Sequence, residues 1–145
     1  MERREGGFGL IEVLVSMLML GVGILGMIGL QLNALQYSQT ASFRSHATFL
    51  AYDIADRMRA NAPAALAGSY SIGLTDSAPS GSGIASTDLR EWKTAMATQL
   101  PVGNGSVSKN GDIYSITVQW DESKSGGEAA QQFVFTTRLC ERDCL

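Results

Sequence analysis

The chain has 145 residues, of which 45% are hydrophobic, and a formal net charge of -3 at pH 7. This length fits one small domain plus an N-terminal segment. The acidic balance argues against a duplex-binding protein, which needs a basic surface to face the phosphates, so no nucleic acid is expected among the partners.

An apolar segment begins a few residues into the chain. Glu12 is the only ionisable residue from Phe8 to Leu32, and at about 1.5 Å per residue a helix of this length crosses a hydrocarbon core of about 30 Å. Arg3 and Arg4 come before the segment and favour a cytoplasmic N-terminus. A cleaved secretory signal and a generic single-span anchor are alternatives. The segment is longer than the usual core of a secretory signal, and neither alternative explains Glu12.

The carboxylate of Glu12 needs a partner, because a charge inside a bilayer costs about 3 kcal/mol. A cut between Gly7 and Phe8 would supply one. The new α-ammonium group of Phe8 would lie four residues before Glu12, on the same face of the helix. The two charges can pair within one chain or between neighbouring chains. A pair between chains would set the register of helices packed side by side.

The stretch "EGGFGLIE" carries this arrangement and resembles the class III signal sequence of type IV prepilins. The resemblance implies that residues 1–7 are a leader peptide, removed after Gly7 by a prepilin peptidase at the cytoplasmic face. It also implies N-methylation of Phe8. Prepilins usually carry Thr or Ser after the Phe, and Gly9 is a departure that leaves the cut site intact.

The apolar segment is expected to continue as a helix beyond the membrane, since no proline occurs before Pro63. We predict one helix from Phe8 to about Asn61, with a transmembrane part at 8–32 and a periplasmic part at 33–61. Apolar positions three or four residues apart form a stripe that would pack on the C-terminal domain. These positions are Leu32, Leu35, Phe43, Ala47, Leu50, Ile54 and Met58.

Charged residues near the end of this helix lie mainly off the apolar stripe. Asp53, Asp56, Arg57 and Arg59 are expected to form a solvated face with local ion pairs. His46 is interpreted as an ordinary surface or packing residue.

Four glycines interrupt the apolar segment, at Gly21, Gly23, Gly26 and Gly29. Two interpretations stay open. Small residues let helices approach closely in membranes, and glycines lower helix propensity, so the segment could unwind when the subunit leaves the bilayer.

The resemblance extends beyond the signal. The stretches "QLNALQYSQTASFRSHATFLAYDIADRMRAN", "DLREWKTAMATQLPVGNGSV" and "ITVQWDE" resemble PilV-type minor pilins, also called type IV pilus modification proteins. The resemblance implies an α+β, pilin-like fold, in which a long N-terminal helix, transmembrane in its first half, packs on a small C-terminal antiparallel β-sheet. The partners that it implies are other minor pilins, the major pilin and a tip adhesin.

Residues 62–145 are predicted to form the globular α+β domain. Alternating apolar residues in "SYSIGLT" indicate a short strand, and Ser77–Gly83 has the composition of a loop. A helix is predicted over Thr87–Leu100, with Asp88 as its N-cap and Glu91 completing a capping box. Its apolar side would consist of Leu89, Trp92, Met96 and Leu100.

The last third of the chain has the pattern of a sheet. "NG" at Asn110-Gly111 predicts a tight hairpin. After it, Tyr114, Ile116, Val118 and Trp120 share one face of a strand, and Phe133, Phe135, Thr137 and Leu139 alternate in the next. A sheet with one face on the long helix would bury both apolar surfaces.

Two cysteines, Cys140 and Cys144, lie close together at the end of the chain. A disulfide between them is favoured in an oxidising compartment, although its geometry does not follow from sequence. Together with His46 they do not make a metal-binding set. No metal or other cofactor is expected.

The sequence does not indicate an enzyme, since it suggests no nucleophile–base pairing and no phosphate loop. The adjacent acids Asp121 and Glu122 are interpreted as solvated charges at a strand end. The resemblance implies instead a minor pilin that helps to prime type IV pilus assembly. It would be held in the inner membrane, with its C-terminal domain in the periplasm, until it joins the filament. Alternatives are a pseudopilin of a type II secretion system and a membrane-anchored periplasmic enzyme.

Overall fold

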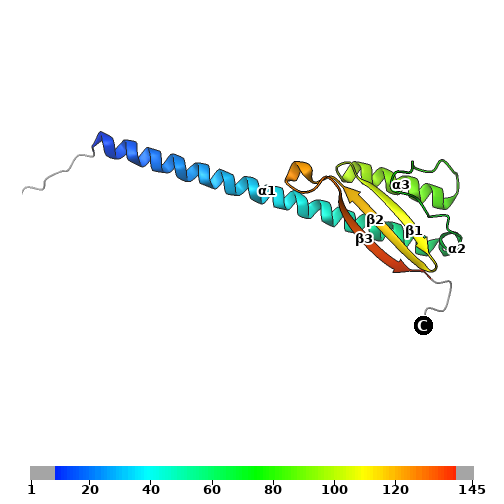
Figure 1. The fold of residues 1–145 in the computed structure, drawn as a ribbon. Helices are drawn as coiled ribbons and strands as arrows, with labels where there is room; N and C mark the ends of the chain where they lie inside the picture. The colour runs from blue at the N-terminus through cyan, green and yellow to red at the C-terminus, as the bar shows by residue number, and fades with distance from the viewer. Residues whose placement is uncertain (1–8, 140–145) are drawn as a thin grey trace, which may run out of the picture. The chain divides into compact units, whose positions relative to one another are not determined.

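The fold is α+β and pilin-like, with a long N-terminal apolar helix and a small three-stranded antiparallel sheet (Figure 1). The computed structural model describes residues 9–139, which form two compact units divided between Ser38 and Gln39. The elements in chain order are α1 (Leu10–Ala60), α2 (Ala62–Leu66), α3 (Ile84–Gln99), β1 (Asn104–Asn110), β2 (Ile113–Trp120), the 3-10 turn η1 (Ser123–Ser125) and β3 (Gln131–Arg138).

Helix α1 contributes to both units, and the predicted long helix is confirmed over the described residues. In the second unit its buried residues follow a helical spacing and form one face of the core: Ala47, Leu50, Ala51, Ile54, Ala55 and Met58. The prediction is wrong for Leu32 and Leu35, which are 57% and 62% exposed. Both come before Gln39, where the second unit begins, and residues 9–139 leave both side chains exposed.

The sheet has the strand order β1-β2-β3, and both strand pairs are antiparallel. Asn110 pairs with Ile113, so the hairpin turn consists of Gly111 and Asp112. Gly111 has a φ of 62°, a conformation that glycine adopts without strain. The predicted inward face of β2 is confirmed, since Tyr114, Ile116, Val118 and Trp120 are all buried. In β3 the alternate residues Phe133, Phe135 and Thr137 are less exposed than their neighbours, as predicted.

Helix α3 begins earlier than predicted. Its N-cap is Gly83, which makes no side-chain capping bond, so Asp88 lies inside the helix and the predicted capping box is wrong. The Asp88 carboxylate instead accepts a hydrogen bond of 2.5 Å from the Tyr70 hydroxyl. The predicted apolar side of the helix is confirmed by the burial of Leu89, Trp92, Met96 and Leu100.

The segment between α1 and α3 differs from the sequence-based expectation. The predicted strand is reduced to a single antiparallel bridge between Ile72 and Val107. The short helix α2 was not predicted. Pro63 lies in its first turn, where a proline displaces no helical hydrogen bond.

Arg57 is not part of a solvated face, contrary to the prediction. Its guanidinium lies 3.0 Å from Asp53 within α1, as expected for a local pair, but also 3.2 Å from Asp88 and 2.7 Å from Glu91 in α3. These bonds, first of all the one to Glu91, raise the pKa of Arg57. The residue therefore links α1 to α3.

Glu122 is also not a solvated charge, because only 2% of its side chain is exposed. Its carboxylate accepts a hydrogen bond of 2.8 Å from the indole nitrogen of Trp120 and lies 3.7 Å from the guanidinium of Arg44. Gly127 packs against it so closely that an added Cβ would lie 2.6 Å from the Cβ of Glu122. The acid therefore stabilises the connection between β2 and β3 from inside.

Candidate assembly segment

Glu12 lies in the first turn of α1, directly after the point where the helix begins. The carbonyl of Gly9 accepts hydrogen bonds from the backbone N–H of Glu12 at 2.9 Å and of Val13 at 3.4 Å. The first backbone N–H groups of a helix have no partners within the helix, and they favour a nearby negative charge. The position of Glu12 is therefore electrostatically suited to a carboxylate.

The side chain of Glu12 is exposed and forms no ion pair with any residue from 9 to 139. Only its backbone is engaged further, since its carbonyl accepts a hydrogen bond of 2.7 Å from the Ser16 hydroxyl. A cation for this carboxylate must therefore come from outside that part of the chain. Gly7 and Phe8 lie outside the described residues, so the cut site and the methylated amine stay predictions.

The first thirty residues of α1 carry a large apolar surface on which nothing else from residues 9–139 packs. Every large hydrophobic side chain from Leu10 to Leu35 is exposed, between 43% at Val13 and 86% at Leu10. The most apolar window of the helix has a mean hydropathy of 2.4, and none of it is buried within the structure. A helix that is apolar on all sides belongs in a bilayer or against other protein. Length and composition therefore suit α1 to anchor the chain in a membrane.

The four glycines of this segment do not interrupt α1. A Cβ added at Gly21, Gly23, Gly26 or Gly29 would meet nothing within 4 Å. Contacts within the described chain therefore do not require glycine there. A close helix neighbour would supply such a requirement, and the unwinding interpretation stays a prediction.

Other predicted site residues are distant in sequence from this segment. Cys140 and Cys144 lie outside the described residues, so their disulfide stays a prediction. His46 is exposed on α1, as expected for a surface residue. Residues 9–139 contain no cluster of three or more His, Cys, Asp or Glu side chains able to hold a metal ion.

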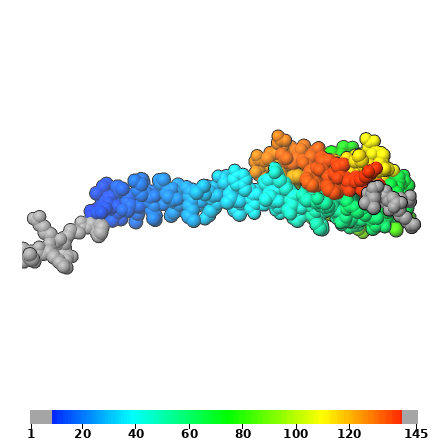
Figure 2. All heavy atoms as spheres, turned by 90° about the horizontal axis from the view of Figure 1, so that it is seen from below, coloured from blue at the N-terminus to red at the C-terminus, as the bar shows by residue number. Residues whose placement is uncertain are grey.

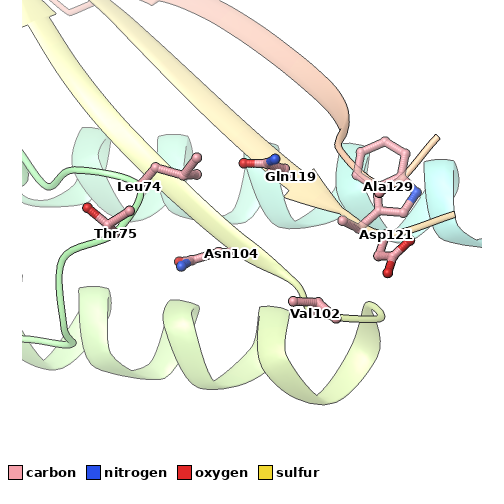
Figure 3. Close-up of a pocket in the computed structure, with 8 residues that line it drawn as sticks. Leu74, Thr75, Val102, Asn104, Gln119, Asp121 and Ala129 are labelled. Carbon is pink, nitrogen blue, oxygen red and sulfur yellow. The ribbon is translucent and has the colours of Figure 1, made fainter. Parts of the chain in front are cut away.

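The second unit has a hollow of about 230 Å³ beside the paired ends of β1 and β2 (Figure 3). Its polar side chains include the hydroxyl of Thr75, the amides of Asn104 and Gln119 and the carboxylate of Asp121, and no His, Cys or Lys lines it. Hydrogen bonds from Ser123 lower the pKa of Asp121, which keeps this acid ionised. The hollow therefore contains one carboxylate and one hydroxyl, and no His, Cys or Lys beside them.

Lys93 is a buried polar residue that the sequence analysis missed. Its ammonium donates to the carbonyls of Gly73 and Leu74, both at 3.2 Å, and to the side-chain oxygen of Asn104 at 2.7 Å. Burial lowers the pKa of Lys93. A signal was present, because Lys93 is four residues from Leu89 and therefore on the apolar side of α3. It ties the segment before α3 to the start of β1.

Comparison with known families supports the interpretation of the N-terminal segment. Residues 3–28 match the prokaryotic N-terminal methylation motif. Comparisons with curated proteins and with solved structures gave no match. The motif is of the prepilin type and supports a type IV pilin-like or pseudopilin-like role. It implies processing by a prepilin peptidase and assembly with other pilins, and it agrees with membrane anchoring through α1.

Proposed function

We propose that this protein is a minor pilin of the PilV type, a structural and assembly subunit without catalytic activity. It stays in the inner membrane as a single-pass protein, with its C-terminal domain in the periplasm, until it joins a pilus. There it helps to prime assembly at or near the tip, together with other minor pilins, the major pilin and a tip adhesin. In this way it supports adhesion and twitching motility.

The observation that carries this proposal is the carboxylate of Glu12, which has no ion-pair partner among residues 9–139. It lies in the first turn of an exposed apolar helix, inside the matched motif at residues 3–28. A charge at this place is costly in lipid unless a cation neutralises it. The α-ammonium group of a cleaved and methylated Phe8 on a neighbouring subunit would do so during docking. An enzyme or a simple anchor has no need of this arrangement.

Mass spectrometry of the N-terminus of the mature protein tests this proposal directly. The expected polypeptide begins at N-methylated Phe8. The variant Gly7→Leu should keep its leader, because a bulky residue before the cut blocks processing. A native protein that still begins at Met1 would contradict the proposal.

A pseudopilin of a type II secretion system is the second candidate, because the matched motif is compatible with that role too. Deletion of the gene separates the two. Loss of surface pili and of twitching with normal secretion is expected for the minor pilin. Loss of secretion with normal pili would favour the pseudopilin.

A membrane-anchored periplasmic enzyme is the rival from another class. It requires turnover by the second unit, and the hollow shown in Figure 3 offers one carboxylate and the hydroxyl of Thr75, without His, Cys or Lys. We expect no turnover from the purified protein, and a phenotype confined to filaments.

A further inference from the structure

Strand β3 is an edge strand whose outer backbone groups can be identified. The N–H of Leu139 donates to the carbonyl of Asp112 at 3.1 Å, which shows that the odd-numbered residues of this strand bond toward β2. Because bonding directions alternate along a strand, the even-numbered residues direct their N–H and C=O groups outward. These residues are Gln132, Val134, Thr136 and Arg138. No backbone group within residues 9–139 pairs with this edge.

This edge lacks the features that usually protect a strand from further pairing. Natural edge strands are protected by prolines, bulges or central charges. From Gln131 to Arg138 there is no proline, the only charge is that of Arg138 at the end, and the pairing with β2 runs through eight residues without a bulge. The opposite edge of the sheet is different, because the bridge from Ile72 to Val107 occupies the middle of β1. Within residues 9–139, the edge of β3 is therefore the open one of the two.

Helix α1 presents two exposed aromatic side chains beside this edge. The ring of Tyr52 lies 4.5 Å from the ring of Phe135, and Arg59 donates to the Thr137 hydroxyl at 2.9 Å. Phe49 is three residues before Tyr52 and so neighbours it on the helix surface. Tyr52 is 47% exposed and Phe49 is 64% exposed. Figure 2 shows the side of the second unit on which β3, in orange to red, lies along α1.

We propose that the edge of β3 binds an extended segment of another subunit by strand addition. Its backbone would pair with Gln132, Val134 and Thr136, and every second side chain would lie over Tyr52 and Phe49. The chemistry of the occupant follows from these groups: an uncharged strand with apolar residues at alternate positions on its helix side. This inference rests on the proposed function, because it takes the partner to be a different subunit of the same filament.

A second copy of this chain fits the edge less well. An antiparallel contact between two β3 strands would turn the two α1 helices in opposite directions, which chains anchored in one membrane do not adopt. A parallel two-fold contact would place the outer face of the second β3 on Tyr52 and Phe49. On that face Val134 is apolar, whereas Gln132, Thr136 and Arg138 are polar or charged. Both arrangements are less favourable than an alternating apolar strand.

Hydrogen exchange tests the pairing residue by residue. In the full-length protein in detergent, the outward amides of Val134 and Thr136 should exchange fast, and the inward amides of Phe133 and Phe135 slowly. In sheared filaments that contain the protein, the two outward amides should slow by about tenfold or more. If the amides of Val134 and Thr136 exchange as fast in filaments as in detergent, the inference is overturned.

Substitution at Val134 gives a matched pair of variants. Val134→Pro removes one outward N–H and leaves the bonds to β2 in place, since prolines are tolerated at that side of an edge strand. It should lower incorporation into filaments by about fivefold or more, whereas Val134→Thr, which keeps the N–H, should not. If the proline variant unfolds, Thr136→Lys is used in its place, because it puts a charge on the edge strand. Its control is Thr117→Lys, which puts the same charge on the central strand β2. Incorporation of the edge variants at the level of their controls would contradict strand addition.

Cross-linking identifies the occupant and separates this inference from the proposed function. A benzophenone amino acid at Thr136 in the full-length protein in membranes should form an adduct with a different pilin subunit. An adduct between two copies of this chain would overturn the choice of occupant. Wild-type protein missing from filaments would contradict the proposed function, whereas normal entry of both wild type and Val134→Pro would contradict only the strand addition.

Discussion

At the residue scale, the most informative side chain is the carboxylate of Glu12. It is exposed, lies at the positive end of a helix and has no cationic partner in residues 9–139. In a bilayer, the hydrocarbon around this carboxylate would exclude water, so charges there would be screened only weakly. A cation that arrives with another subunit would therefore stabilise the carboxylate strongly. Its contribution should therefore appear in assembly rather than in the folding of the single chain.

Replacing Glu12 by Ala should leave processing intact and impair assembly. In the proposed function the peptidase would cut before this residue, whereas docking of the variant would lose the partner of the neighbouring amine. We expect incorporation of Glu12→Ala into filaments to fall by about tenfold or more. Quantitative immunoblots of sheared filaments and of membranes measure this ratio, with Glu12→Asp as the charge-preserving control. Wild-type incorporation of Glu12→Ala would refute the pairing.

Tyr70 is a second residue with a measurable effect. It is fully buried, donates to the Asp88 carboxylate at 2.5 Å and accepts from the Asn61 amide at 3.1 Å. Burial first, and then the bond to Asp88, raise the pKa of Tyr70 to about 12. The folded state therefore favours the protonated phenol. Its stabilising effect should be complete below the unfolded pKa of about 10 and lost as the pH rises toward 12.

The variant Tyr70→Phe tests this dependence on pH. Denaturant titrations of the wild type between pH 9 and 12 should show a free energy of unfolding that falls with pH. Tyr70→Phe should be less stable at neutral pH by about 1–2 kcal/mol, because a buried hydrogen bond is lost. Its stability should also fall less steeply above pH 10. Parallel pH curves for the two proteins would show that Tyr70 is not responsible.

At the scale of elements, charged side chains add polar contacts between segments of the second unit, beside its apolar core. Arg57 joins α1 to α3, Lys93 joins the segment before α3 to β1, and Glu122 stabilises the connection between β2 and β3. Each charged group is surrounded by partners, and no buried side-chain polar atom of the described residues lacks a hydrogen bond. Such contacts are costly to break on one side, because the remaining group stays buried without a partner.

Glu122→Ala should destabilise the connection between β2 and β3. It leaves the buried indole N–H of Trp120 without its acceptor, which costs about 1–3 kcal/mol. Glu122→Gln keeps an oxygen that can accept this bond and should cost less. Urea denaturation followed by tryptophan fluorescence compares the two variants. Equal losses for Ala and Gln would show that the charge toward Arg44, rather than the bond to Trp120, is what matters.

At the scale of the whole molecule, the division into two units separates assembly from folding. The first unit exposes its apolar side chains, and the buried core begins at Ala47 in the second. Burial of apolar surface is the main source of folding free energy. The stability of the globular part should therefore not depend on the apolar anchor, whereas membrane retention and filament entry should.

Truncation tests this separation. A fragment that begins at Gln39 should remain in solution without detergent and unfold cooperatively, because it retains the whole buried core. A fragment that begins at Leu50 also lacks Phe43 and Ala47 and should be less stable by about 2 kcal/mol or more. Circular dichroism during thermal unfolding compares the two. A fragment from Gln39 without a cooperative transition would show that the first unit contributes to folding.

Several features of this protein follow from local patterns in its sequence. The absence of proline and the apolar composition predicted α1, the alternation at Tyr114, Ile116 and Val118 predicted the inward face of β2, and the glycines before Phe8 indicated the signal. Period and composition are properties of a continuous stretch of chain, so they can be read without knowing what lies opposite.

The roles of the charged residues and the limits of the packed stripe depend instead on contacts made in the folded chain. Asp88 resembles an N-cap in sequence, yet its carboxylate accepts a hydrogen bond from Tyr70 and pairs with Arg57, both of which lie outside α3. Glu122 resembles a solvated strand end, yet it lies under Trp120. Leu32 has the spacing of a core residue, yet the core begins further along α1. Each outcome depends on a partner distant in the chain, and local patterns carry no information about such partners.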